Sequence, residues 1–220
     1  MLSPSETTAH QGSLSLRSEL HLTRKAWHIF TGLSGLALYE TFQFSPHFMA
    51  TVLAVVGGLG FMVDFFRLRL PEMNRLVLMM MGPLMRESER NGMSGLPFYA
   101  LGVSLTLFFY PEKLAILAIL FLIFADPIAS VVGILYGQDR ILKNKSLQGS
   151  FAGFVTCYVL TLVYGIYYIE LSAELLFFSL FAGVIGALSE MFPGKLDDNL
   201  TIPVLSGFGL TFLNLFFKLY

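Results

Sequence analysis

Two groups of polar residues in an otherwise apolar sequence carry side chains suited to binding a phosphorylated molecule and a metal ion. The first group begins at Asp126, which is followed at helical spacing by Ser130, Gly133 and Gly137. These four residues share one face of a helix, and the small side chains leave room beside the carboxylate for another molecule. The two glycines also have a structural interpretation, because a Gly-x-x-x-Gly spacing lets membrane helices pack closely.

A basic segment follows at the start of the next predicted helix. It contains Lys145, Ser146, Gly149 and Ser150. The lysine supplies positive charge for phosphate, and the free backbone N–H groups of a helix N-terminus bind anions. Together with Asp126, this segment predicts a site for a nucleoside triphosphate.

The second group lies near the C-terminus, where Glu190, Asp197 and Asp198 occur close together in the sequence. Mg²⁺ prefers oxygen ligands, commonly one or two carboxylates together with substrate phosphates. We therefore predict a Mg²⁺ site with Asp126, Asp197 and Asp198 as its protein ligands. The alternative interpretation is an acidic turn exposed to water, in which Asn199 caps the following helix.

The composition places these residues in a membrane protein. Hydrophobic residues make up 55% of the chain and charged residues only 13%, whereas a soluble domain carries about 25% charge. The net charge of -1 argues against a nucleic-acid partner, which requires a basic surface. Residues 1–18 have no apolar signal sequence and are predicted to be a disordered arm, which leaves residues 19–220 as a single transmembrane domain.

The expected fold is all-α and polytopic, with about seven transmembrane helices. A helix needs about 20 apolar residues to cross a bilayer, and seven windows meet or approach this length. The windows are Trp27–Phe44, Phe48–Phe66, Leu96–Tyr110, Leu114–Tyr136, Phe151–Ile169, Ala173–Met191 and Leu200–Phe217.

The distribution of basic residues predicts the orientation. Of the 14 Lys and Arg residues, all except Lys113 and Lys218 fall on one side of this seven-helix arrangement. Because cytoplasmic loops are enriched in basic residues, we expect a cytoplasmic N-terminus and an external C-terminus. The segment near residues 67–92 has too short an apolar stretch to span, and we expect it to lie on the cytoplasmic membrane surface.

Most of the remaining ionisable residues are predicted to lie at the cytoplasmic ends of the spans. Arg24, Lys25 and His28 start the first span, Glu87 precedes the third, and Glu190 ends the sixth. Ionisable groups beside hydrocarbon usually have a function. A pump or channel would distribute them through the membrane depth, so this one-sided arrangement favours a shallow pocket that opens to the cytoplasm.

In their order along the chain these motifs resemble those of the CTP-dependent lipid kinases, which include dolichol, phytol and farnesol kinases and the CTP-dependent diacylglycerol kinase. The matching segments are Arg24-Lys25-x-x-His28, Glu87 followed by Gly95-x-x-x-Tyr99-x-x-Gly102, Asp126-x-x-Ala129-x-x-x-Gly133-x-x-x-Gly137, Lys145-Ser146-x-x-Gly149-Ser150, Glu190, and Asp198-Asn199-Leu200-Thr201-Ile202-Pro203. They extend over nearly all of the chain after the N-terminal arm.

The resemblance implies transfer of the γ-phosphate of CTP to the hydroxyl of an isoprenoid alcohol or of diacylglycerol within the bilayer. The candidate CTP-binding residues are Arg24, Lys25, Ser130, Gly133, Gly137, Lys145, Ser146, Gly149, Ser150 and Asn199. The candidate catalytic residues are Asp126, His28, Glu87 and Glu190. The sequence does not choose the group that accepts the hydroxyl proton, for which Glu89 is a further candidate.

Three other assignments remain open from the residues alone, and a purely structural membrane scaffold is one of them. A cytidylyltransferase would use CTP, Mg²⁺ and a membrane lipid in the same way, but it would release pyrophosphate and form a CDP-lipid. A transporter is disfavoured by the one-sided placement of the charges.

Overall fold

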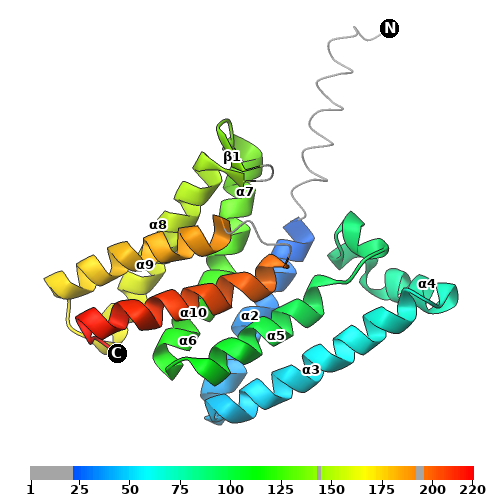
Figure 1. Ribbon diagram of the computed structural model, residues 1–220, viewed down its shortest axis with the longest axis horizontal. Coiled ribbons are helices and arrows are strands. Elements are labelled where there is room, and N and C mark those ends of the chain that lie inside the picture. The colour runs from blue at the N-terminus through cyan, green and yellow to red at the C-terminus, as the bar shows by residue number, and fades with distance from the viewer. Residues whose placement is uncertain (1–21, 143–144, 192–195) are drawn as a thin grey trace, which may run out of the picture.

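The computed structural model describes residues 22–142, 145–191 and 196–220 (Figure 1). The predicted disordered arm, residues 1–18, lies outside these ranges. In chain order the elements are α2 (Leu22–Phe42), α3 (Pro46–Arg67), α4 (Pro71–Met81), η1 (Gly82–Leu84), η2 (Glu87–Arg90), α5 (Gly95–Phe109), α6 (Glu112–Leu120), η3 (Phe121–Ala125), α7 (Asp126–Tyr136), β1 (Arg140–Leu142), β2 (Lys145–Ser146), α8 (Leu147–Tyr168), α9 (Ala173–Met191) and α10 (Asp198–Phe217).

The chain is a helical membrane protein, and each of the seven predicted windows coincides largely with a helix. Five helices in the described part of the chain are long and apolar enough to cross a bilayer: α3, the continuous segment Glu112–Tyr136, α8, α9 and α10. The prediction of about seven spans is therefore only partly supported. Helix α5 has only 15 residues, and polar residues in the first turns of α2 lower its mean hydropathy.

Local sequence explains where several helices begin. Ser45 precedes Pro46 and accepts a hydrogen bond from the Phe48 N–H at 3.3 Å, which starts α3. Ser146 caps α8 by accepting from the Gly149 N–H at 3.2 Å, and Asp197 caps α10 by accepting from the Asn199 N–H at 3.0 Å. Such caps satisfy N–H groups that lack a partner within the helix.

The predicted straight helix Leu114–Tyr136 is interrupted by η3, which is a π-helix. The Asp126 N–H bonds to the Phe121 carbonyl, five residues back. The next residue is Pro127, which has no N–H to donate and so cannot continue that pattern. The Leu122 carbonyl is consequently left without its helical partner, and the helix is irregular immediately before Asp126.

A short two-stranded hairpin connects α7 to α8 within a fold that is otherwise helical, in keeping with the predicted all-α class. Strands β1 and β2 pair antiparallel, with Arg140 opposite Ser146. The strand pattern covers too few residues to produce a recognisable alternation in the sequence. The hairpin nevertheless matters, because it places Lys145 and Ser146 at the N-terminus of α8.

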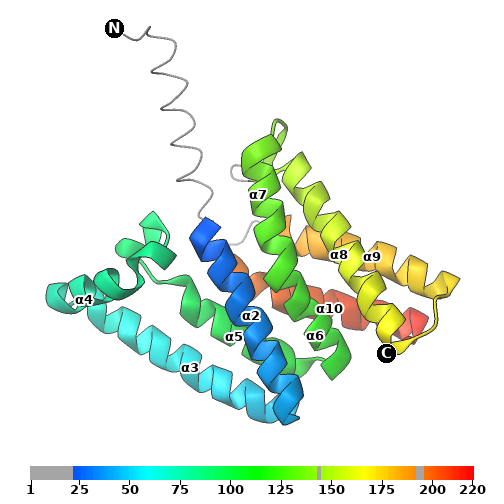
Figure 2. The same cartoon turned by 180° about the vertical axis from the view of Figure 1, so that it is seen from behind.

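The core surrounds α6 and η3. Leu114, Leu117 and Phe121 are fully buried there and pack with Phe178 of α9 and Leu210 of α10. Large apolar side chains elsewhere are exposed, as expected for surfaces that face lipid rather than water. Figures 1 and 2 show α2 on one face of the bundle, opposite the face that carries α10.

Candidate active site

A polar cavity of about 590 Å³ lies where α2, α7, β2, α8, α9 and α10 converge. It brings together residues that are more than 170 positions apart in the sequence, from Arg24 to Asn199. The predicted site residues in its lining are Arg24, Lys25, His28, Asp126, Ser130, Gly133, Lys145, Ser146, Gly149, Ser150, Glu190, Asp198 and Asn199. Most of the predicted site residues therefore line one connected cavity.

The glycines of α7 and α8 bring these two helices close together beside the cavity. A Cβ added at Gly149 would lie 2.8 Å from the Ala129 carbonyl oxygen and 3.1 Å from the Gly133 Cα. A Cβ at Gly137 would collide with the Gly133 carbonyl and Ser146. The packing interpretation thus holds for all three glycines, while Gly133 and Gly149 also line the cavity. Gly137 lies outside the lining.

Lys145 connects three elements through ion pairs. Its Nζ lies 2.7 Å from Glu190 Oε1 on α9 and 3.1 Å from Asp198 Oδ2 at the start of α10. Ser150 donates to the other Glu190 oxygen at 3.5 Å. Burial lowers the pKa of the Lys145 amine, but Asp198 and Glu190 more than offset it, so that its pKa is raised. Lys145 is therefore positively charged at neutral pH.

His28 is held by the irregularity of η3. Its Nε2 lies 3.1 Å from the Leu122 carbonyl oxygen, the group that Pro127 leaves without a helical partner. A carbonyl oxygen only accepts, so Nε2 carries the proton, and in neutral His28 the other ring nitrogen, Nδ1, is an acceptor. The ring also makes an edge contact with Tyr99, with centroids 4.9 Å apart. These contacts fix a potential proton acceptor in the lining of the cavity.

Two neighbouring basic residues of α2 differ in their partners. Arg24 Nη1 donates to both carboxylate oxygens of Glu89, at 2.8 and 2.9 Å. The Lys25 Nζ is buried and has no hydrogen-bond partner within the described part of the chain. A buried polar group without a partner is destabilising, so the Lys25 amine is a cation in the cavity lining that a bound anion would stabilise.

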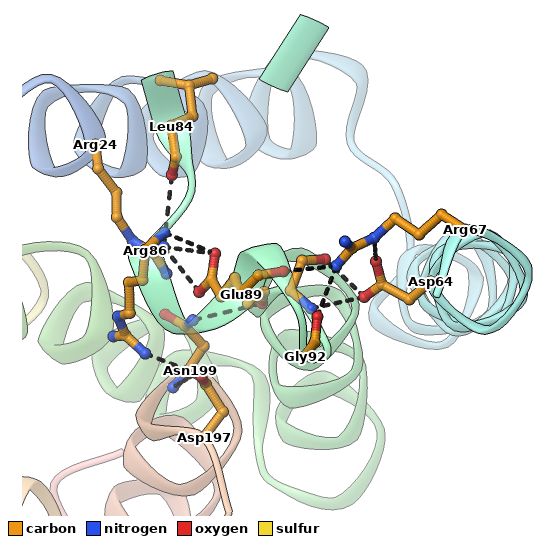
Figure 3. A network of polar contacts seen from close by, with 11 residues as sticks. Arg24, Asp64, Arg67, Leu84, Arg86, Glu89, Gly92, Asp197 and Asn199 are labelled. Carbon is orange, nitrogen blue, oxygen red and sulfur yellow. Dashed lines mark hydrogen bonds and ion pairs between the residues drawn. The ribbon is translucent and has the colours of Figure 1, made fainter. Parts of the chain in front are cut away.

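A buried network positions the loop that carries Glu89 (Figure 3). Arg67 and Asp64, both on α3, form an ion pair at 2.5 Å with side chains that are only 0% and 4% exposed. Arg67 Nη2 donates to the carbonyls of Glu89 and Gly92 at 3.0 and 2.7 Å. Asp64 Oδ2 accepts from the backbone and the hydroxyl of Ser94 at 2.7 and 2.8 Å. The end of α3 is thereby connected, through Glu89, to Arg24.

Besides Gly137, two predicted site residues lie outside the lining of the cavity. The Glu87 side chain is 83% exposed and pairs with Arg90 at 3.0 Å. The Asp197 side chain caps α10 and pairs with Arg86 at 3.1 Å. In both cases a residue close by in the sequence has the inward position, Glu89 for Glu87 and Asp198 for Asp197.

Two basic residues of the cavity were missed by the sequence analysis, namely Arg86 and Arg140. The only local signal for Arg86 is its spacing from Glu89, whose carboxylate accepts from the Arg86 N–H at 3.1 Å in the manner of a capping box. Arg140 lies on β1 opposite Ser146, and the sequence pattern does not predict this hairpin.

The predicted set of three metal ligands is not assembled. Within the described residues, no group of three or more His, Cys, Asp or Glu side chains is placed to hold a metal ion. Asp126 and Asp198 do line the same cavity. Two carboxylates fit the usual coordination of Mg²⁺, which takes its other ligands from substrate phosphates and water.

One cavity at the ends of apolar helices contains both basic side chains and carboxylates. Phosphoryl transfer depends on charges arranged in this way, so the site is that of a membrane-embedded phosphotransferase. Comparison with known proteins narrows this class. The chain is 37% identical over 200 residues to CTP-dependent diacylglycerol kinase 1 of Schizosaccharomyces pombe, covering 84% of this chain and 89% of the relative. It is 30% identical to the protein of the same name in Saccharomyces cerevisiae, covering 84% and 70%.

A more distant relative is the probable phytol kinase 2, chloroplastic, of Oryza sativa subsp. japonica, which is 29% identical over 86% of this chain and 64% of its own length. No protein-family profile and no solved structure matches the chain. The chain belongs to the family of CTP-dependent lipid kinases, which are phosphotransferases with an alcohol group as acceptor.

The buried pair of Asp64 and Arg67 gives a first prediction. Asp64→Ala leaves the Arg67 charge buried without its partner and should destabilise the protein by about 3–5 kcal/mol. Glu87→Ala, which removes the exposed pair with Arg90, is the matched control and should change stability by no more than about 1 kcal/mol. Denaturant unfolding in detergent measures both; equal effects of the two substitutions would contradict the structural role of the buried network.

Proposed function

We propose that this CTP-dependent lipid kinase phosphorylates the free hydroxyl of diacylglycerol, with CTP bound in the polar cavity. The observation that carries the assignment of the cavity is the buried Lys25 amine, which lacks a partner within the described residues. The relatives with the higher identities are named as diacylglycerol kinases. Isoprenoid alcohols are the second candidate class of acceptor, because a relative is named as a phytol kinase.

The triphosphate would lie between α2 and the N-terminus of α8. Lys25 and Arg24 would neutralise phosphate charge from one side, and Lys145 from the other. The Ser150 hydroxyl would donate a hydrogen bond to a phosphate oxygen at the N-terminus of α8, whose partial positive charge also favours an anion. The carboxylates of Glu190 and Asp198 hold the Lys145 amine in place, so that it presents a fixed positive charge.

Asp126 and Asp198 would hold Mg²⁺ against the phosphates, where the ion would neutralise charge that develops during transfer. The lipid hydroxyl oxygen would attack the γ-phosphorus, forming a new O–P bond as the bond to the bridging β–γ oxygen breaks and CDP leaves. The proton of the hydroxyl would pass to Nδ1 of His28. Its Nε2–H bond to the Leu122 carbonyl keeps this tautomer in place.

We further propose that α2 and α5 also cross the membrane, which gives seven spans. This topology puts the cavity on the cytoplasmic side, with the N-terminus in the cytoplasm and the C-terminus outside. The uneven distribution of Lys and Arg supports it, as does the gathering of cavity residues at the same ends of α2, α9 and α10. Single cysteines introduced near Lys113 and Lys218 test this topology. An impermeant reagent added to intact cells should label both cysteines, and protection of both would contradict the proposed topology.

Transfer of label tests the proposed reaction. Purified protein in lipid nanodiscs should transfer the γ-phosphate of CTP to diacylglycerol, release CDP and require Mg²⁺. A panel of phytol, farnesol and longer polyprenols should accept less well. Faster transfer to an isoprenoid alcohol would reassign the acceptor. Transfer of only the α-phosphate, with release of pyrophosphate, would make the chain a cytidylyltransferase, and transport of a solute without transfer of either label would make it a transporter.

The roles of Asp126 and His28 give another prediction. Asp126→Asn should abolish transfer, and His28→Gln should lower kcat by about 10²–10⁴-fold, as expected for loss of a general base. Both proteins should still fold and elute as the wild type does. Glu87→Gln is the control and should keep the wild-type rate, because Glu87 points away from the cavity. Wild-type turnover of Asp126→Asn would refute its place in the site.

A further inference from the structure

Two further cavities extend from the polar cavity along α2. The first has a volume of about 240 Å³ and shares Arg24, His28 and Asn199 with the lining of the polar cavity. The second has a volume of about 400 Å³ and shares Thr31 and Tyr99 with the first. The three spaces thus adjoin one another in sequence. We call the two further cavities together the α2 groove.

The lining of the α2 groove becomes less polar with distance from the active site. Next to His28 it includes Arg24, Asp64 and Glu89. Farther along, its side chains are almost entirely apolar: Leu36, Leu38, Phe42, Phe44, Met49, Leu53, Val103, Leu107 and Ile119. A polar end beside the reacting groups and a long apolar end match an amphiphile with one polar headgroup and a hydrocarbon tail.

The α2 groove exists because α2 touches the bundle at separated points. Near its start, His28 bonds to the Leu122 carbonyl. One turn later, Gly32 lies so close to Ile123 and Tyr99 that an added Cβ would contact both. At the far end the Tyr39 hydroxyl donates to Glu112. Helix α3 instead packs against α5, and Figure 2 shows α2 crossing in front of that pair.

Between these contact points, Gly35 leaves space. A Cβ added at Gly35 would have no heavy atom within 4 Å, although the residue lines the α2 groove. Gly35 is also exposed on the outside of the bundle. An apolar chain could therefore enter the groove laterally from the bilayer, without passing through the cytoplasm.

On the basis of the proposed kinase function, we propose that the hydrocarbon chain of the lipid acceptor lies in the α2 groove, between α2 and the pair α3–α5. The hydroxyl end lies beside His28 and faces the polar cavity. The tail runs past Tyr99 and Gly35 toward Phe42. The α2 groove is thereby the acceptor site. The length and width of the groove select among lipid acceptors by the size of their hydrocarbon chains.

A bulky residue at Gly35 tests the assignment. Gly35→Phe should fill the groove and raise KM for a long-chain acceptor by at least about tenfold, roughly the effect of losing two buried methylene groups. KM for CTP should not change. Gly58→Phe on α3 is the matched control, because Gly58 is also exposed with no heavy atom within 4 Å of an added Cβ and lines none of the three cavities. It should behave as wild type.

The proposal is overturned if Gly35→Phe leaves KM for the long-chain acceptor unchanged, or if Gly58→Phe raises it equally. A second measurement does not depend on turnover. A diacylglycerol with a photoreactive diazirine in its acyl chain is crosslinked to the protein in nanodiscs, and the labelled peptides are identified by mass spectrometry. Peptides covering residues 31–44 and 99–107 should be labelled in the wild type and lose the label in Gly35→Phe. Labelling confined to other surfaces would also overturn the proposal.

These two measurements separate the failure of the α2 groove from the failure of the proposed function. If the wild-type protein phosphorylates no lipid alcohol, the kinase assignment of the acceptor fails, and the crosslinking still reports whether the groove holds a chain. If diacylglycerol is phosphorylated but the label avoids the groove, the proposed function stands and the acceptor site lies elsewhere.

Discussion

Charged side chains that lie beside hydrocarbon must have partners, and this constraint organises the site. Removing one ion from water costs several kcal/mol, so most of the buried charges here are held by an opposite charge. Five ion pairs lie around the cavity: Arg24 with Glu89, Arg67 with Asp64, Arg86 with Asp197, Lys145 with Glu190, and Lys145 with Asp198. Apart from the pair within α3, they join α2, α9, α10, β2 and the loop before α5.

Three charged residues of the cavity lining have no ion-pair partner within the described residues, namely Lys25, Asp126 and the exposed Arg140. Lys25 has no hydrogen-bond partner, and Asp126 has no ion-pair partner, within the described residues. One is a cation and the other an anion, which is what a metal-bound polyphosphate requires on its two sides. In the proposed function, these are the two positions that a nucleotide with its cation would occupy.

The irregular helix at Phe121–Ala125 connects this electrostatic arrangement to catalysis. Pro127 has no backbone N–H to donate. The His28 side chain, on a different helix, donates instead to the Leu122 carbonyl that lacks a helical partner. Asp126, which directly follows this irregular helix, lines the cavity. A π-helix at a functional site is a recurrent feature of proteins, and here its backbone polarity orients a side chain on α2.

Much of the fold was predictable because apolar length and helical spacing are local properties. All seven windows lie largely on helices, and most of the predicted site residues line one cavity. The errors in the predicted site occur where the direction of a side chain depends on the geometry of a loop. Glu87 and Glu89 are two residues apart in a short 3-10 helix, yet only Glu89 points inward. Asp197 and Asp198 are adjacent, but the cap of α10 turns the first of them away.

The α2 groove could not be predicted in the same way. It results from the distance between α2 and the pair α3–α5, which depends on contacts such as that of Gly32 with Tyr99. No periodicity in α2 distinguishes a residue that faces a groove from one that faces lipid, because both are apolar. Likewise, the sequence gives no sign that Arg140 reaches the cavity, since its position depends on a hairpin of few residues.

The most direct test of the central claim is equilibrium binding of CTP, with Mg²⁺, to the wild type and to Lys25→Met in detergent. If the buried amine contacts the phosphates, its loss should weaken CTP binding by at least about tenfold, the effect of removing a hydrogen bond to a charged group. Lys113→Met, on the opposite side of the molecule, should bind as the wild type does. Unchanged affinity in Lys25→Met would contradict the assignment of this cavity as the nucleotide site.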